Sequence, residues 1–499
     1  MKIHIMRNHE PFRSLSRLCV VLSTMLALLF AAGCAVVPTA DSDPVAAIRN
    51  NRAMLQYFFS QMPKGGDLHN HLTGSAYAET YFDIAVNARM YLDTQTFKLY
   101  KEISEVPPQH HAIQLRPDMP DLHGVRIKCI EAWSIRDYEH LARTLPPDEF
   151  FFNTFGIFGN AASGIPNHTT LLRELRQRAA HENVSYLEIM LTSPTIKASM
   201  NKDAELVERL KAGIRDRDSE TFQSLLREIQ DTWERDASIQ QDIDGYARMI
   251  GQVHNDAANV APGVVSRYQT YCSRNSDPLT VFAQLYIGFK ASERSPLLVG
   301  VNIVAPENGE VALRDYWGHM EMFKHFKSLY PSVKTAMHAG ELRLGLTPPE
   351  DMNFHITDAV FQAGADRIGH GVDIAFETNA QKTLKEMASK KIAVEINLTS
   401  NEFILGVKGS EHPLMLYLAN NVPIVLSTDD PGILRSNLTE QYVLAAERYS
   451  ELKYPDFQEF ARNSIVYSFL PEEEKEHLLA NLDKRFQEFE SKMNMGKRP

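Results

Sequence analysis

Cysteine is scarce in this sequence, which limits how the fold can be stabilised. The 499 residues include four cysteines, and two of them, Cys19 and Cys34, lie near the N-terminus. The other two, Cys129 and Cys272, allow either one disulfide bond in an oxidising compartment or two buried free thiols. No Cys-x-x-Cys pair occurs, so a zinc site held by paired sulfur ligands is excluded.

An excess of basic residues is also lacking. The chain has 52 lysines and arginines against 63 aspartates and glutamates, which gives a formal net charge of -11. This balance argues against nucleic acid as a partner. With 44% hydrophobic and 23% charged residues and no internal repeat, the composition is that of a globular protein and disfavours disordered, collagen-like and coiled-coil classes.

The apolar run nearest the N-terminus is too short to span a membrane. Leu18 to Phe30 is almost wholly apolar and follows a basic head. A membrane-spanning helix needs roughly 18 to 20 apolar residues, more than this run provides. A basic head followed by a short apolar run is typical of a signal peptide, which we predict over residues 1–33.

The residues Ala31-Ala32-Gly33-Cys34 resemble a bacterial lipobox, in which the cysteine is acylated and becomes the mature N-terminus. We therefore predict lipidation at Cys34, a tether over residues 34–50 and a folded body over 51–499. The alternative is a plain secretory signal that ends near Ala32. Since Ala35 rather than Asp follows the cysteine, the resemblance to lipoprotein sorting favours export to the outer membrane, facing the periplasm or the cell surface. Membrane contact is then expected through the lipid alone.

Eight short, β-rich apolar segments alternate with long stretches of helical spacing. Strands that alternate with helices imply right-handed crossovers and a parallel sheet, and eight such units close a barrel. The sequence therefore predicts the α/β class, a (β/α)8 TIM barrel with helical insertions. An open doubly wound sheet is the alternative, but no Gly-x-Gly-x-x-Gly follows the first strand. The expected strands are Asp67–His71, Val184–Met190, Val264–Tyr271, Leu298–Val304, Val333–His338, Arg367–His370, Ile392–Asn397 and Pro423–Thr428.

Two connections are unusually long, Leu72 to Asn183 and Thr192 to Gly263. We expect both to be helical excursions over the mouth of the barrel, with an insertion within 72–183, because insertions in this architecture often shape substrate access.

Side chains that can bind a metal stand where strands are expected to end. His69 and His71 are separated by one residue, and alternation along a strand places both imidazoles on one face. His338, His370 and Asp429 end three other expected strands, at the edge where barrels of this type carry their active sites. Imidazoles with a carboxylate suit a divalent zinc-type ion.

Two further acids accompany these ligands. Glu341 follows His338 closely, and Asp430 follows Asp429 directly. If the chain is extended there, neighbouring side chains face opposite sides, so one aspartate faces the metal and the other faces a substrate.

The motifs GGDLHNHLTGS, YLEIMLTSP, MHAGE, RIGHG and LSTDDP stand in the order and approximate spacing of the adenosine deaminase family of the metal-dependent hydrolase superfamily. The chain resembles this family over roughly Pro63 to Leu479. The opening PKGGDLHNHL is most similar to the secreted, growth-factor-related branch.

The resemblance implies a role for each matching residue. It implies one zinc ion per chain bound by His69, His71, His338 and Asp429. Glu341 and His370 would be catalytic: Glu341 would protonate the purine nitrogen N1, and His370 would orient the attacking water and accept its proton, although our reasoning from the residues leaves open a base or an electrostatic guide. The substrate-binding residues would be Asp430 against N7, the backbone of Ala305 against N3, Thr73 and His71.

Three departures from the family pattern concern the substrate rather than the metal. Ala305 stands where the family generally has Gly, and Thr73 stands where well-known members have an Asp that contacts the ribose. Asn397-Leu398 replaces the more usual Cys-Pro.

We predict that the protein deaminates a 6-aminopurine nucleoside, converting adenosine or 2′-deoxyadenosine to inosine or 2′-deoxyinosine with release of ammonia. The partner is then a small purine nucleoside, and a homodimer is one option for assembly. The alternatives are a deaminase of adenine or another aminopurine, and a surface binding module without catalysis, which would need neither Glu341 nor His370.

Overall fold

The computed structural model describes residues 43–141, 145–197, 200 and 203–493. The expected signal peptide, Cys34 and most of the expected tether lie outside these residues. The described part begins with helix α2 (Pro44–Ile48), in which Val45 is fully buried.

Eight parallel strands form one sheet in the order β1-β5-β6-β7-β8-β9-β10-β11. Each expected strand is found, with ends that differ by no more than two residues, and the (β/α)8 TIM barrel is confirmed. Most strand residues are buried, and most of the strands are mainly apolar, although the first and third strands in this order carry many polar residues. They are β1 (Gly65–His71), β5 (Val184–Met190), β6 (Val265–Ser273), β7 (Leu298–Val304), β8 (Lys334–Ala339), β9 (Arg367–His370), β10 (Ala393–Ile396) and β11 (Ile424–Leu426).

The first and last strands meet just beyond the end of β11. Asn70 and Asp429 form an isolated parallel bridge. The Asp429 amide donates to the His69 carbonyl at 2.8 Å, and the His71 amide donates to the Asp429 carbonyl at 3.0 Å. The barrel is therefore closed by residues that the sequence analysis assigned to the metal site.

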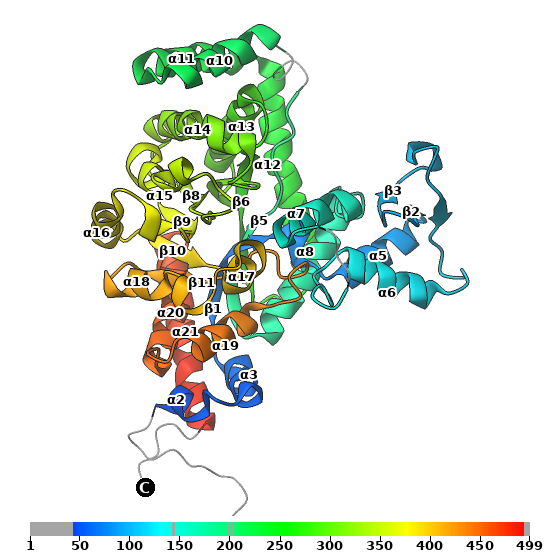
Figure 1. Cartoon of the computed structure of the whole chain (residues 1–499), viewed down its shortest axis with the longest axis vertical. Helices are drawn as coiled ribbons and strands as arrows, with labels where there is room; N and C mark the ends of the chain where they lie inside the picture. The colour runs from blue at the N-terminus through cyan, green and yellow to red at the C-terminus, as the bar shows by residue number, and fades with distance from the viewer. Residues whose placement is uncertain (1–42, 142–144, 198–199, 201–202, 494–499) are drawn as a thin grey trace, which may run out of the picture.

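Helices surround the strands, as Figure 1 shows. For example, α13 packs on β6 and β7, and α20 packs on β1 and β11. The helices that accompany the barrel are α3 (Arg52–Gln61), α8 (Ile165–His181), α12 (Ala237–Ala257), α13 (Pro278–Arg294), α14 (Glu310–Leu329), α15 (His355–Asp358), α16 (Ala380–Lys390), α17 (Leu398–Leu405), α18 (Leu414–Ala419), α19 (Leu438–Arg448), α20 (Tyr454–Val466) and α21 (Glu472–Lys492). Short 3-10 or π turns lie at η1 (Ile103–Glu105), η2 (Pro349–Met352), η3 (Ala359–Ala363), η4 (Ile374–Phe376) and η5 (Gly409–Glu411).

We had expected the connection between β1 and β5 to be helical, but it also contains strands. It contains a small antiparallel sheet in the order β3-β2-β4, beside α5 and α6 at the right of Figure 1. The sheet was missed because its strands are only two or three residues long, too short for an alternating pattern. The elements are α4 (Leu72–Ser75), α5 (Ala78–Asn87), β2 (Tyr91–Asp93), β3 (Leu99–Tyr100), β4 (Ala112–Gln114), α6 (Leu122–Ala132) and α7 (Pro147–Phe158).

The connection between β5 and β6 is helical, as expected, but much of it does not cover the mouth. Helices α10 (Ala204–Asp216) and α11 (Ser219–Glu234) pack on the outer helices α13 and α14. Their apolar residues form one face that is buried there, while the other face carries the charges. The position of these two helices corrects our expectation that the whole segment is an excursion over the barrel mouth.

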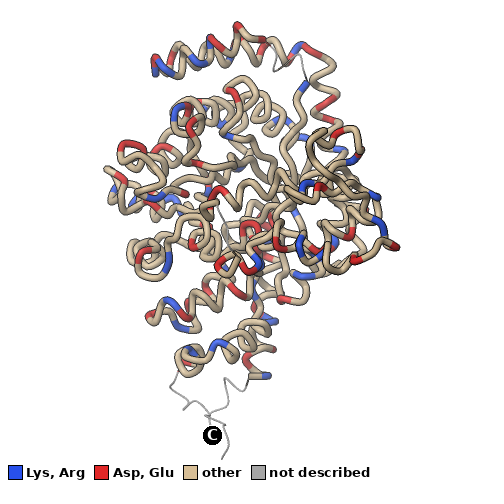
Figure 2. Tube along the Cα trace, turned by 45° about the vertical axis from the view of Figure 1, so that its right-hand side comes forward, with Lys and Arg blue, Asp and Glu red and all other residues tan. Residues whose placement is uncertain are grey.

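Cys129 and Cys272 are both buried and free, so of the two alternatives the structure has free thiols. Burial raises the pKa of each thiol to about 12, which keeps it protonated and unreactive. In the described ranges, no helix combines the length and apolar character required to cross a bilayer. Figure 2 shows acidic and basic residues interspersed along the outer helices.

Candidate active site

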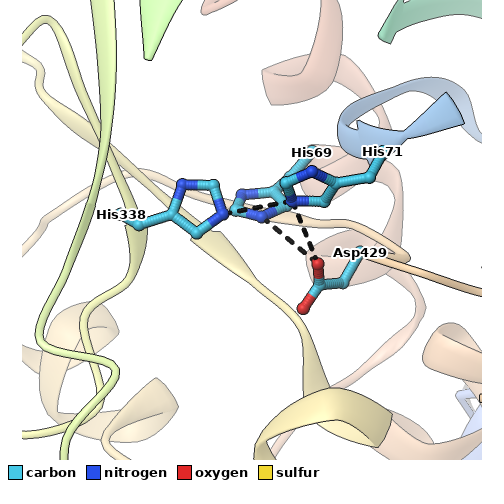
Figure 3. A group of neighbouring side chains, drawn as sticks. All are labelled: His69, His71, His338 and Asp429. Carbon is cyan, nitrogen blue, oxygen red and sulfur yellow. Dashed lines mark hydrogen bonds and ion pairs between the residues drawn. The ribbon is translucent and has the colours of Figure 1, made fainter. Parts of the chain in front are cut away.

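Four side chains from three strand ends converge on one point. The His71 Nε2 atom lies 3.2 Å from His338 Nε2 and 3.3 Å from Asp429 Oδ1. The His69 Nε2 atom lies 3.6 Å from the same carboxylate oxygen. One ligand atom from each of the four residues lies within 4.8 Å of the others. Figure 3 shows the four side chains pointing toward one another. The expected metal-binding residues are therefore brought together.

The spacing of this cluster and the neutral form of two of its three imidazoles fit a tetrahedral zinc ion. Ligand atoms about 2.0–2.1 Å from a tetrahedral ion lie about 3.3 Å from one another, close to the separations observed here. The pKa of His71 is lowered to about 4, and that of His338 is also lowered, chiefly because both rings are buried. Both imidazoles are thus neutral, which is the form that binds metals. His69 Nε2 is buried and has no hydrogen-bond partner. Although burial opposes it, the carboxylates of Asp429 and Glu395 raise the pKa of His69 to about 10, so a bound ion would displace the proton on its Nε2 atom.

Asp429 reaches the cluster through an unusual backbone conformation. Its φ is 63°, in the left-handed region, and β11 has already ended at Leu426. The premise that Asp429 and Asp430 lie on an extended strand is therefore wrong. Their side chains nevertheless have different neighbours, since Asp429 lies beside His71 and Asp430 lies against Gly74. His370 and Ala305 are also left-handed, with φ of 66° and 82°. Such conformations cost free energy and cluster at functional sites.

A buried chain of charged groups orients His69. Its Nδ1 atom lies 2.7 Å from a Glu395 carboxylate oxygen, and Arg367 Nε donates to the other Glu395 oxygen at 2.6 Å. Arg367 also donates to Glu188. Burial opposes ionisation of Glu395, but Arg367 and His69 lower its pKa to about 2. A carboxylate at Nδ1 leaves the Nε2 lone pair of His69 directed at the metal position.

A second chain orients His338 in the same way. Its Nδ1 atom lies 3.0 Å from Asn302 Oδ1, and the Asn302 amide donates to Gln269 at 2.8 Å. Gln269 in turn donates to Glu188 at 2.8 Å. Because the amide nitrogen of Asn302 points to Gln269, its oxygen accepts from His338, and the lone pair of His338 Nε2 faces the cluster. The two chains meet at Glu188, inside the barrel.

Glu341 and His370 lie beside Asp429, the carboxylate that also belongs to the group of four metal-binding residues. Ligand atoms of Glu341, His370 and Asp429 form a second group within 4.8 Å of one another. Burial, with the nearby carboxylates Asp429 and Glu307, raises the pKa of Glu341 well above its usual value. The Glu341 amide donates to Glu307 at 2.8 Å, which fixes the backbone that carries it. The surroundings of Glu341 therefore favour its protonated form.

A hydrogen-bond relay fixes the tautomer of His370. The Leu414 amide donates to His412 Nδ1, so the other ring nitrogen of His412 donates to Asn401 Oδ1, 3.1 Å away. The amide nitrogen of Asn401 then faces His370 Nδ1, at 3.0 Å, and that nitrogen accepts. Burial lowers the pKa of His370 to about 3. Neutral His370 therefore carries its proton on Nε2, which faces the metal cluster.

Asp430 is buried and its Oδ1 atom has no hydrogen-bond partner. Burial and the charge of Asp429 raise its pKa well above the ordinary value. The carboxyl group packs directly on Gly74, where an added Cβ would come within 1.6 Å of Oδ1. Glycine at position 74 is therefore required for Asp430 to occupy this place.

A cavity of about 270 Å³ connects these groups, and we call it the main cavity. The expected substrate-binding residues Thr73, Ala305, Asp430 and His71 all line it. The lining residues are His71, Thr73, Phe151, Phe152, Phe155, Tyr271, Val304, Ala305, Pro306, His338, Glu341, His370, Ile404, Asp429 and Asp430. Glu341 and three of the four metal-binding residues, His71, His338 and Asp429, thus line the same cavity.

Besides Asn401, His412 and Glu307, described above, the sequence analysis missed two sets of residues at this site. The first is the polar set Glu188, Gln269, Asn302, Arg367 and Glu395, whose signal was a charged or amide residue inside an apolar strand. The second is the aromatic face of α7, where Phe151 and Phe155 recur at helical spacing. The insertion therefore supplies one wall of the main cavity.

Comparison with known proteins agrees with this geometry. The model of the family described as adenosine deaminase matches residues 149–485. An adenosine deaminase of Clostridium perfringens is 24% identical over 414 residues, which cover 83% of this chain and 96% of that protein.

Two solved structures share the fold. An adenine deaminase from Arthrobacter aurescens aligns with a TM-score of 0.52 and 17% identity over 85% of this chain and 98% of that one. An amidohydrolase from Burkholderia ambifaria with bound Zn aligns with a TM-score of 0.56 and 16% identity over 88% and 94%. The family match and the convergent site together establish that the chain belongs to the adenosine deaminase family of metal-dependent enzymes and is an aminohydrolase.

Proposed function

We propose that this protein is a zinc-dependent deaminase of a 6-aminopurine nucleoside. The reaction converts adenosine or 2′-deoxyadenosine and water to inosine or 2′-deoxyinosine and ammonia. The observation that carries the proposal is the convergence of four metal-binding side chains with Glu341 and His370. One zinc ion per chain is expected, bound by His69, His71, His338 and Asp429. When bound, such an ion lowers the pKa of a water molecule from about 15.7 to about 7.

The chain's own residues supply the remaining chemistry. Attack at C6 makes an aromatic carbon tetrahedral and pushes electron density onto the ring nitrogen N1. Glu341, whose surroundings favour its protonated form, transfers a proton to N1 and removes that charge. His370 donates its Nε2 proton as a hydrogen bond to the attacking oxygen and directs it at C6. The fixed tautomer favours an electrostatic guide over a base.

The other contacts orient the base. Asp430, whose pKa is raised, is a hydrogen-bond donor suited to the purine N7, which is an acceptor. The backbone N–H of Ala305 is suited to N3 for the same reason. The aromatic and apolar side chains Phe155, Tyr271 and Val304 enclose the ring and exclude water.

Deamination of adenine or another aminopurine is the second candidate. The feature that favours it is Thr73, which replaces the aspartate expected at the ribose and offers a weaker, uncharged contact. A binding module without catalysis is disfavoured, because binding alone requires neither a protonated buried Glu341 nor an oriented His370.

Ammonia release from adenosine, 2′-deoxyadenosine, adenine and AMP, with zinc analysis of the same sample, tests the proposal. His338→Ala and Asp429→Ala should each lose bound zinc and turnover together. His254→Ala is the matched control, since this histidine bonds Tyr268 on the outside of the sheet and should retain both. Full activity of either ligand variant in a zinc-free preparation would refute the metal assignment.

We further propose that the protein is exported and anchored through Cys34, at the outer membrane, and that it is closest to the secreted, growth-factor-related branch of the family. The support is the N-terminal sequence alone. Labelling with a radioactive fatty acid should mark the wild-type protein and Cys129→Ser but not Cys34→Ser. Equal labelling of Cys34→Ser would disprove the anchor. Light scattering on the purified protein tests whether it is a homodimer.

A further inference from the structure

A second cavity adjoins the main cavity, and we call it the side cavity. It measures about 460 Å³ and shares two lining residues, Thr73 and Phe155, with the main cavity. Its other walls come from the end of α7 and the loop after it, the start of α8, the loop after β5 and Met249 on α12. None of the four metal-binding residues lines the side cavity, so a group bound there would not contact the metal position directly.

The side cavity has the mixed lining of a ligand site. His168 is 8% exposed, and its Nδ1 atom is buried without a hydrogen-bond partner. Ser193, Thr195 and Met249 also line this cavity. An unpaired buried polar atom costs free energy unless a ligand satisfies it. Concave sites lined by apolar groups with a few polar ones are typical of small-molecule binding.

The proposed substrate orientation places the sugar at the junction of the two cavities. Deamination requires C6 to lie next to the metal cluster, and the sugar is attached at N9, on the other ring of the purine. The sugar therefore lies on the side of the base away from the metal. The 5′ carbon is the sugar's only exocyclic carbon. Because Thr73, expected beside the ribose, lines both cavities, a group attached to this carbon can reach the side cavity.

The described lining of the side cavity carries no lysine, arginine, aspartate or glutamate. A phosphate group there would meet no counter-ion among these residues and would depend on water at the exposed rim formed by Ser163, Gly164 and Thr195. Burial lowers the pKa of His168, so this ring is neutral and does not supply the missing charge. The lining therefore disfavours nucleotides and suits a group with no net charge.

Resting on the proposed function, we infer that the side cavity binds an uncharged substituent on the 5′ carbon of a 6-aminopurine nucleoside. Hydroxyl groups and the His168 ring contact its polar atoms, and Met249 and Phe155 contact its apolar part. The preferred substrate is then a 5′-substituted nucleoside rather than the unsubstituted nucleoside or its phosphate.

The test compares kcat/KM for 5′-S-methyl-5′-thioadenosine, adenosine and AMP. In the wild-type protein the thioether should be the best of the three and AMP the poorest. Met249→Trp fills the side cavity, so the ratio of kcat/KM for the thioether to that for adenosine should fall about tenfold. Met54→Trp is the matched control, because Met54 is 49% exposed on α3, and it should leave the ratio unchanged.

Ser193→Leu narrows the same cavity from another wall and should lower the ratio too, which keeps the test valid if Met249→Trp does not fold. Preference for AMP, or a ratio that neither folded variant changes, overturns the inference alone. Absence of ammonia from every nucleoside overturns the proposed function, and the inference with it.

Discussion

At the scale of single residues, the site depends on positions that most side chains would not tolerate. Ala305, His370 and Asp429 have left-handed backbones, and each lines the main cavity. Gly369 illustrates a different restriction: an added Cβ would lie 2.8 Å from the ring of His69. Local conformation, and not only residue type, therefore brings the functional groups together.

The first prediction concerns Ala305→Gly. A left-handed conformation costs alanine about 1–2 kcal/mol, and replacing alanine with glycine removes this strain. Part of the gain in stability is lost because glycine makes the unfolded chain more flexible. We expect the variant to be more stable by about 0.5–1 kcal/mol, measured by urea unfolding. Removing the methyl group also widens the main cavity, so KM for adenosine should change. Lower stability would show that the methyl group makes stabilising contacts that outweigh the strain.

The second prediction concerns pH and Lys64, which is buried at the start of β1. Burial lowers its pKa from 10.5 to about 7, despite the nearby Glu182. Between these two pH values the unfolded chain binds a proton that the folded protein does not, so the free energy of unfolding rises with pH. From pH 7 to pH 9, the wild type should gain about 2 kcal/mol relative to Lys64→Met.

The other titratable groups are the same in both proteins, so their contribution to the pH dependence cancels in the difference between the two free energies of unfolding. Parallel stability curves for wild type and Lys64→Met over this pH range would show that Lys64 keeps its charge in the folded protein.

At the scale of elements, the strands are held in register by polar side chains as well as by their backbones. Glu188 on β5 accepts from Arg367 on β9 and from Gln269 on β6. It also accepts from the Tyr186 hydroxyl at 2.8 Å and from the Phe469 amide at 2.9 Å. This one carboxylate therefore joins three strands and the chain segment after α20.

The third prediction follows from these bonds. Glu188→Gln keeps the shape but turns an amide donor toward other donors and leaves Arg367 with one carboxylate partner in place of two. We expect a loss of about 3 kcal/mol in the free energy of unfolding and weaker zinc binding. Glu220→Gln on the exposed start of α11 is the control. Equal stability of the two variants would show that the hydrogen bonds of Glu188 do not stabilise the barrel core.

All eight barrel strands could be predicted from the sequence because each is a short, β-rich segment separated from the next by a stretch of helical spacing, although Gly65–His71 and Val265–Ser273 are not apolar runs. The metal-binding set could be predicted because strand ends of a barrel share one edge. The partners of Glu188 could not, since Gln269 and Arg367 are distant in sequence and nothing local pairs them. The position of α7 beside the main cavity could not be predicted either, because helical spacing identifies an apolar face but not what that face covers.

At the scale of the whole molecule, the ends of the sheet meet at the site itself. Asn70 and Asp429 form the bridge between the first and last strands, and the metal-binding residues flank it. An ion bound there would link β1, β8 and the segment after β11, which lie far apart in the sequence.

The fourth prediction is that zinc stabilises the fold. An ion that binds only the folded protein adds about 2.7 kcal/mol at a free concentration 100 times its Kd. Thermal unfolding should therefore occur at a lower temperature after chelation and recover when zinc is restored. His338→Ala should show no such dependence. A zinc effect of the same size in that variant would locate the stabilising ion elsewhere.

Closure of the barrel at Asp429 has a consequence for how the enzyme comes into being during synthesis. The ribosome has produced the first ligand, His69, long before it reaches the last, Asp429, and until then the earlier ligands have no complete partner set. Truncated products that stop ahead of this aspartate carry most of the barrel yet none of its catalysis. The chain must therefore extend past Asp429, late in translation, before it can turn over substrate.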